Sequence, residues 1–213
     1  NWQGMAALEP FLLPGHFCFG DAKAGGAYQS GRLVCTLKTL DYGPLAGCGE
    51  STLAKSAAAF SGFLPLRRHE NMLHYLWVQY AITGGMWPIL VREGNFRQVF
   101  ASSQNILTAF HAVQECLQVT AARGVDLAEF PETNLYVHPS PLTLWLARTL
   151  MARQFARSEY QKRCSLHALS DPAEVHTFYT DLVENGHRLG VPMPVMNSFA
   201  GEMQRFTAPR SAW

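Results

Sequence analysis

The chain has 213 residues, of which 48% are hydrophobic and 15% are charged, and its formal net charge is +1 at pH 7. This composition is typical of a globular protein with a sizeable core and excludes a disordered chain. A charge near zero without a dense run of Lys or Arg indicates no nucleic-acid partner. No apolar run has the length of a membrane span, which indicates no membrane partner.

Residues 1 to 69 have the pattern of short strands separated by turns. Apolar pieces at 16–19, 32–37 and 63–66 alternate with glycine-rich segments. The segment from Gly20 to Gly26 is expected to be a turn between strands, because Gly26 stands where a phosphate-binding loop requires lysine. Ser51 is expected to cap a helix that runs to Phe60. Strands around one helix predict part of an α/β sheet.

From Glu70 onward the apolar residues recur at helical spacing. One helix is expected over 72–82, broken by Gly84-Gly85 and Pro88, and further helices over 96–123, 142–160 and 174–189. The sequence therefore predicts a mainly α protein. A small α/β remnant would occupy residues 1–69, and an all-helical domain would occupy residues 70–213.

The clearest helix start in the chain lies at Asp171. Asp171 is a preferred N-cap, Pro172 suits the first helical position, and Glu174 falls where the acid of a capping box would lie. Gly190 and the prolines after it end the pattern. Glu174 is either a capping residue or a carboxylate that faces a cleft at the positive end of the helix.

The five cysteines are odd in number, widely spaced and without a Cys-x-x-Cys pair. They indicate reduced thiols and a cytoplasmic protein. His69 and His74 are one residue too far apart for the zinc-binding His-Glu-x-x-His pattern. We therefore expect no metal site.

Five parts of the chain together resemble motifs of the ketopantoate reductase (2-dehydropantoate 2-reductase) family. They are Asn1-Trp-Gln-Gly4, Phe60-Ser-Gly-Phe63, the helix from Asn71 to Trp87, Glu115 followed by Ala121-Ala-Arg-Gly-Val125, and Glu174-Val-His with Gly190-Val-Pro-Met-Pro194. The resemblance implies a helical bundle of the 6-phosphogluconate-dehydrogenase C-terminal-like type, which binds substrate and pairs as a homodimer. It also implies NADPH as cofactor and a small oxo compound as substrate. Asn1 would then be a cofactor-binding residue at the end of a nucleotide-binding domain.

The first long helix departs from the family pattern. Family members carry a lysine there as general acid, with asparagines one and two turns later, and the same register here gives Tyr75, Gln79 and Thr83. Tyr75 is either a proton donor or a packing residue, and its ordinary pKa near 10 makes it a poorer donor than lysine. Gln79 and Thr83 are candidate substrate-binding residues, and Glu174 is the second candidate catalytic residue.

Two hypotheses follow from these patterns. The first is the C-terminal portion of a ketopantoate-reductase-like, NADPH-dependent oxidoreductase, in which Glu174 holds or polarises the substrate. The second is a non-catalytic ligand-binding or interaction module that kept the fold. The absent lysine favours the second hypothesis, whereas Glu174 and the closing Gly-Val-Pro-Met-Pro motif favour the first.

We predict that the 213-residue chain alone is catalytically inert and binds NADPH weakly or not at all. The chain has no G-x-G-x-x-G segment, and such a turn is what receives the pyrophosphate in nicotinamide-dependent enzymes. Calorimetric titration with NADPH is the direct measurement. Low-micromolar affinity would show that the cofactor site lies within the chain.

Overall fold

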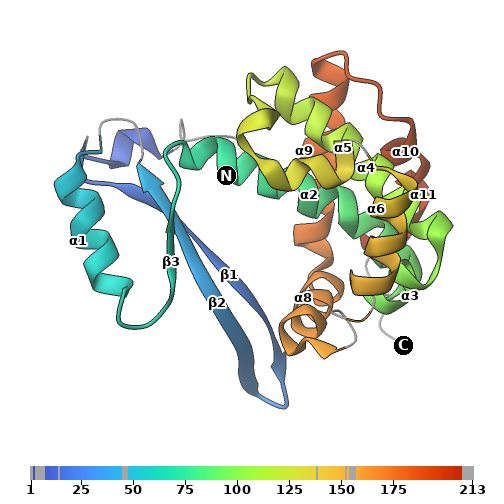
Figure 1. Cartoon of the computed structure of the whole chain (residues 1–213), viewed down its shortest axis with the longest axis horizontal. Coiled ribbons are helices and arrows are strands. Elements are labelled where there is room, and N and C mark those ends of the chain that lie inside the picture. The colour runs from blue at the N-terminus through green and yellow to red at the C-terminus, as the bar shows by residue number, and fades with distance from the viewer. Residues whose placement is uncertain are drawn as a thin grey trace.

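The structure is a computed structural model, and it describes residues 2, 8–13, 15–44, 48–137, 139–151, 153 and 157–207. A small sheet and one helix lie on one side of the molecule, and the remaining helices gather on the other side (Figure 1). All three strands of the described chain precede residue 69, and from Met72 onward its regular elements are helical. The predicted mainly α architecture with a small α/β opening is therefore confirmed at this level.

The sheet consists of a long hairpin and one short strand. Strands β1 (Cys18–Gln29) and β2 (Arg32–Pro44) pair antiparallel, and β3 (Leu66–Arg68) pairs with β2 in parallel. Helix α1 (Glu50–Phe60) connects β2 to β3. It ends at Phe60 as predicted, but its N-cap is Gly49, and the expected role of Ser51 as cap is wrong.

The expected turn over Gly20–Gly26 is also wrong, because these residues lie within β1. The hairpin turns at Ser30 and Gly31, whose φ angles are 49° and 76°. A side chain at Gly26 would place its Cβ 2.8 Å from Cβ of Cys35 on β2. The glycine therefore permits a close approach of the two strands instead of forming a turn.

Helix α2 (Met72–Glu93) is the central element of the core. It was expected to break near residue 84, but it runs without interruption through Gly84, Gly85 and Pro88. A Cβ on Gly84 would lie 2.3 Å from Cδ1 of Leu182, and one on Gly85 would lie 2.6 Å from Cα of Val113. The paired glycines allow neighbouring helices to pack closely, and this packing outweighs the low helix propensity of glycine.

The later helices are shorter than the sequence pattern indicates. The predicted helix over 96–123 is two helices, because Ser102 has an extended backbone and its side chain caps the second one. The predicted helix over 142–160 ends early and passes into a π-helical turn. The helices after α2 are α3 (Phe96–Ala101), α4 (Ser103–Ala122), α5 (Asn134–Val137), α6 (Pro141–Leu146), α8 (Glu159–Ser170), α9 (Pro172–Arg188), α10 (Pro194–Ser198) and α11 (Ala200–Thr207). Single turns occupy Glu9–Phe11 (η1), Leu127–Glu129 (η2), Pro131–Thr133 (η3) and Ala147–Met151 (η4).

Helix α8 fixes the hairpin against the helical part of the molecule. It packs against β1 and β2, and Figure 1 shows it beside the far end of the hairpin. The Arg163 guanidinium donates hydrogen bonds to the backbone oxygen of Cys35, at 2.8 Å, and to the hydroxyl of Thr36. Because α8 leads directly into α9, the hairpin is connected to the start of α9 through this contact.

The surface bears on self-association and on membrane crossing. Aromatic residues of the kind that anchor interfaces stand in the sequence at Trp145, Phe155 and Tyr160. The side chain of Trp145, on α6, is exposed, whereas Phe155 and the side chain of Tyr160 lie outside the described part of the chain. Within the described residues, no helix combines the length and the apolar character that crossing a membrane requires.

A buried carboxylate holds the C-terminal helices on the core. Glu115, on α4, accepts hydrogen bonds of 2.8 Å from the backbone N–H groups of Val195 and Met196, in the first turn of α10. Burial raises the pKa of Glu115, and the two N–H donors oppose that shift. The carboxylate thereby satisfies helix N-terminal donors that would otherwise lack partners.

We predict that Glu115→Ala destabilises the fold by about 2 to 4 kcal/mol, because it leaves two N–H donors without their charged acceptor. Urea unfolding monitored by circular dichroism measures the effect. Glu115→Gln is the matched control, since its one carbonyl oxygen retains part of the interaction and should cost roughly half as much. Equal stability of Glu115→Ala and wild type would contradict the anchoring role.

Candidate functional site

A cavity of about 520 Å³ lies between the hairpin and the helical part of the molecule. Strand β1 contributes residues 21–24, and α2 contributes one long face between Leu76 and Trp87. The end of α8 and the start of α9 complete it, together with Phe96 and Tyr136. The cavity volume is within the range of about 300 to 1,000 Å³ usual for small-molecule sites.

One end of the cavity carries an ion pair from β1. Alternate residues of a strand point to the same face, so Asp21 and Lys23 lie side by side. The Lys23 Nζ lies 2.7 Å from Oδ2 of Asp21 and donates a 3.2 Å hydrogen bond to Oε1 of Gln79 on α2. The Gln79 amide in turn donates to Oε1 of Glu132 at 3.2 Å. Both ends of the Gln79 amide are therefore engaged.

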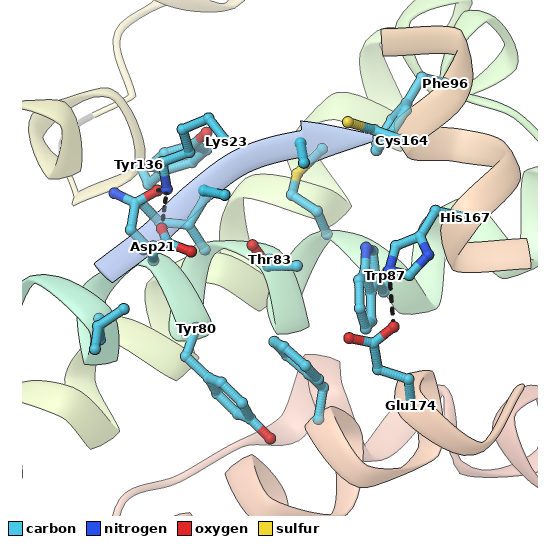
Figure 2. Close-up of a pocket in the computed structure, with 17 residues that line it drawn as sticks. Asp21, Lys23, Tyr80, Thr83, Trp87, Phe96, Tyr136, Cys164, His167 and Glu174 are labelled. Carbon is cyan, nitrogen blue, oxygen red and sulfur yellow. Dashed lines mark hydrogen bonds and ion pairs between the residues drawn. The ribbon is translucent and has the colours of Figure 1, made fainter. Parts of the chain in front are cut away.

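The other end carries a histidine–carboxylate pair. His167 Nε2 lies 2.8 Å from Oε2 of Glu174. Asp171 connects α8 to α9 and caps α9, since its Oδ1 accepts from the Glu174 N–H at 3.0 Å. The predicted N-cap is confirmed, but the Glu174 side chain pairs with His167 and faces the cavity. Figure 2 shows the two pairs at opposite sides of the cavity, with Thr83 between them.

Aromatic rings form the wall between the two polar ends. Phe178, on α9, stacks on Tyr80 with ring centroids 3.7 Å apart and lies 4.5 Å from the Trp87 ring. The Tyr80 hydroxyl donates to Oδ2 of Asp181 at 2.8 Å. Burial, followed by this hydrogen bond to Asp181, raises the pKa of Tyr80. This wall of the cavity is thus apolar, with the tyrosine hydroxyl held in a hydrogen bond.

Tyr75 is buried next to the cavity and is not among its lining residues. Its ring stacks on His69 at 3.7 Å between centroids, and His69 Nε2 lies 2.7 Å from Oδ1 of the buried Asp41. Burial, followed by the charge of Asp41, raises the pKa of Tyr75. The phenol therefore holds its proton more tightly than a free tyrosine does.

The structure brings three of the five predicted site residues to one cavity. Gln79, Thr83 and Glu174 line it, although Glu174 lies more than 90 positions after Thr83 in the sequence. Tyr75 lies to one side because each step of four residues rotates the helix face by about 40°. Asn1 lies outside the described residues.

Sequence reasoning missed Asp21, Lys23 and His167. Asp-x-Lys on a strand places both charges on one face, but this signal was lost when Gly20–Gly26 was interpreted as a turn. His167 lies seven residues before Glu174 and on the other side of the Asp171 cap, so the tight connection of α8 to α9 was the available signal.

Lys23 supplies a positive charge next to Tyr75. Its Nζ lies 5.0 Å from the centroid of the Tyr75 ring, in addition to its contacts with Asp21 and Gln79. The charge thus comes from β1 instead of α2. Within the described residues, no group of three His, Cys, Asp or Glu side chains is arranged to hold a metal ion.

Comparisons with known proteins show a fold relationship. No family model matches the chain, and no curated protein matches it in sequence. The solved structure of D-mandelate dehydrogenase in complex with NADH matches with a TM-score of 0.64 and 16% sequence identity. The match covers 93% of this chain and 65% of that chain. This chain therefore has the fold of part of a dehydrogenase that binds NADH.

Proposed function

We propose that this chain is the substrate-binding portion of a ketopantoate-reductase-like oxidoreductase that acts on a small oxo compound. The observation that carries the proposal is the cavity, which gathers Gln79, Thr83 and Glu174 on a fold shared with a nicotinamide-dependent dehydrogenase. The helices after Glu70 would correspond to a bundle of the 6-phosphogluconate-dehydrogenase C-terminal-like type. Residues 1–69 would be the end of a nucleotide-binding domain.

The residues of the cavity have distinct roles in this proposal. Glu174 orients the His167 imidazole, which can accept or donate a proton at a ring nitrogen, and together they hold the substrate at their end of the cavity. Thr83 lies in the middle of the cavity and offers a hydroxyl to the substrate. Gln79 accepts a hydrogen bond from Lys23 and so holds its ammonium in position. The positive charge of Lys23 stabilises negative charge that develops on a carbonyl oxygen.

NADPH is the cofactor that the family resemblance implies, and it would supply a hydride. The glycine-rich segment from Gly20 to Gly26 is part of β1 and does not form the turn that would receive its pyrophosphate. Asn1 stays the candidate contact of the nucleotide in this proposal.

A non-catalytic ligand-binding module is the second candidate function. It is favoured by Tyr75, which replaces the family lysine and is buried with a raised pKa. In this case the cavity would bind a ligand without converting it. Measured reduction of any oxo compound by the complete protein with NADPH would exclude this second function.

Glu174→Gln is predicted to weaken ligand binding or turnover in the complete protein by more than about tenfold, which corresponds to 1.4 kcal/mol. The exchange removes the negative charge that orients His167 but leaves the Asp171 cap in place, so stability should remain near wild type. Steady-state kinetics and thermal unfolding are the measurements.

Tyr75→Phe is the matched comparison for Glu174→Gln. It removes a hydroxyl outside the cavity lining, so binding and turnover should stay within about twofold of wild type, a difference below 0.5 kcal/mol. If Tyr75→Phe lost activity while Glu174→Gln retained it, the assignment of the two residues would be reversed.

We also propose that the protein forms a homodimer through its exposed apolar helices. Leu142 and Trp145 on α6 are 65% and 60% exposed, and Leu150, in the turn after α6, is 55% exposed. Aromatic and aliphatic side chains of this kind are typical of interface cores. Light scattering is expected to give twice the monomer mass at tens of micromolar. A monomer mass at that concentration would contradict the proposal.

A further inference from the structure

The charges of the cavity bear on the class of substrate, provided that the proposed oxidoreductase site is correct. Its charged lining residues are Asp21, Lys23 and Glu174, and Lys23 is the single Lys or Arg among the described lining residues. Two carboxylates therefore face one ammonium, and the imidazole of His167 is paired with Glu174.

The one cation already has an ion-pair partner and a hydrogen-bond partner. Lys23 lies 2.7 Å from Asp21, and the amide of Gln79 that accepts from Lys23 donates on to Glu132. The other charged end of the cavity carries Glu174, whose partner His167 is a cation only when protonated. A second anion placed in this cavity would therefore meet carboxylates at both ends, without an unpaired cation among the lining residues described.

The aromatic wall of the cavity favours an apolar ligand with a flat ring. Trp87, Phe178 and Tyr80 form a continuous set of ring contacts along one wall. Rings prefer offset stacking or edge contacts with other rings, which adds to the burial of apolar surface. A carboxylate in the same place would lose its hydration without gaining a charged partner.

We propose that the substrate is an uncharged aromatic ketone or aldehyde, and not a 2-oxo acid. An ammonium has three hydrogens, and the contacts of Lys23 with Asp21 and Gln79 use two of them. The third is available to the carbonyl oxygen. The ring then packs on the aromatic wall, and the paired charges of the cavity discriminate against a substrate carboxylate.

The test compares acetophenone with phenylglyoxylate. Both have a phenyl ring next to a ketone, but acetophenone has a methyl group where phenylglyoxylate has a carboxylate. Isothermal titration of the 213-residue chain measures both affinities. Acetophenone is expected to bind at least about tenfold more tightly than phenylglyoxylate.

Asp21→Asn is the informative variant, because it removes one carboxylate and leaves Lys23 uncompensated. It should shift the ratio of the two affinities toward phenylglyoxylate by about tenfold. Glu184→Gln is the charge-matched control: Glu184 is an exposed residue of α9 outside the cavity lining, so this exchange should leave the ratio unchanged.

The outcomes separate this inference from the function on which it rests. If wild type binds phenylglyoxylate more tightly than acetophenone, or if Asp21→Asn leaves the ratio unchanged, the inference is overturned and the oxo-compound site remains. If wild type binds neither compound at millimolar concentration, the proposed substrate site is itself wrong, and the inference falls with it.

Discussion

The close packing of α2 against α4 and α9 is the constraint on which the cavity depends. At Gly84 and Gly85 any side chain would overlap Leu182 or the backbone of Val113. This contact sets the distance between Thr83, which directly precedes the glycines, and the start of α9, which carries Glu174 and Phe178. A larger residue at Gly84 would move α9 outward, and Glu174 would move with it, whereas one at Gly85 would move α4 away from α2.

The hairpin forms the second wall of the cavity and supplies its positive charge, Lys23. Strand β1 reaches the cavity because α8 packs against it, and Arg163 holds the adjacent strand through the backbone oxygen of Cys35. Lys23 then contacts Gln79 across the cavity. The positive charge of the cavity is therefore delivered by a strand and held in place by a helix. A site of this kind needs both parts of the molecule in place.

The sequence predicted the features that depend on neighbouring residues. The change from strand-like to helical patterns near residue 70, the Asp171 cap and the end of α1 at Phe60 are all local signals, and the structure contains them. The predictions from the sequence were wrong where packing between distant segments determines the secondary structure. Gly84, Gly85 and Pro88 interrupt a helix by propensity alone, but the contacts of α2 with α4 and α9 stabilise the continuous helix.

In the candidate site, too, the residues with a local sequence signal were predicted, and those that depend on contacts between distant segments were missed. Gln79 and Thr83 share a helix face by spacing, and Glu174 follows a recognisable cap, so these three were found. Lys23 was missed because it lies in β1, a strand of 12 residues from Cys18 to Gln29. The glycines of this strand made the sequence resemble a turn. His167 was missed because it faces Glu174 only when α8 and α9 meet at Asp171. Neither position has a local signal as strong as the Asp171 cap.

The most direct test of the account is whether a small ketone enters this cavity. The chain has five tryptophans, of which Trp87 lines the cavity and Trp145 is exposed on α6. Protein labelled with 5-fluorotryptophan gives one fluorine resonance for each, and Trp87→Phe and Trp145→Phe assign these two. The account predicts that acetophenone shifts the Trp87 resonance and leaves that of Trp145 in place. An unchanged Trp87 resonance at a concentration where calorimetry shows binding would contradict it.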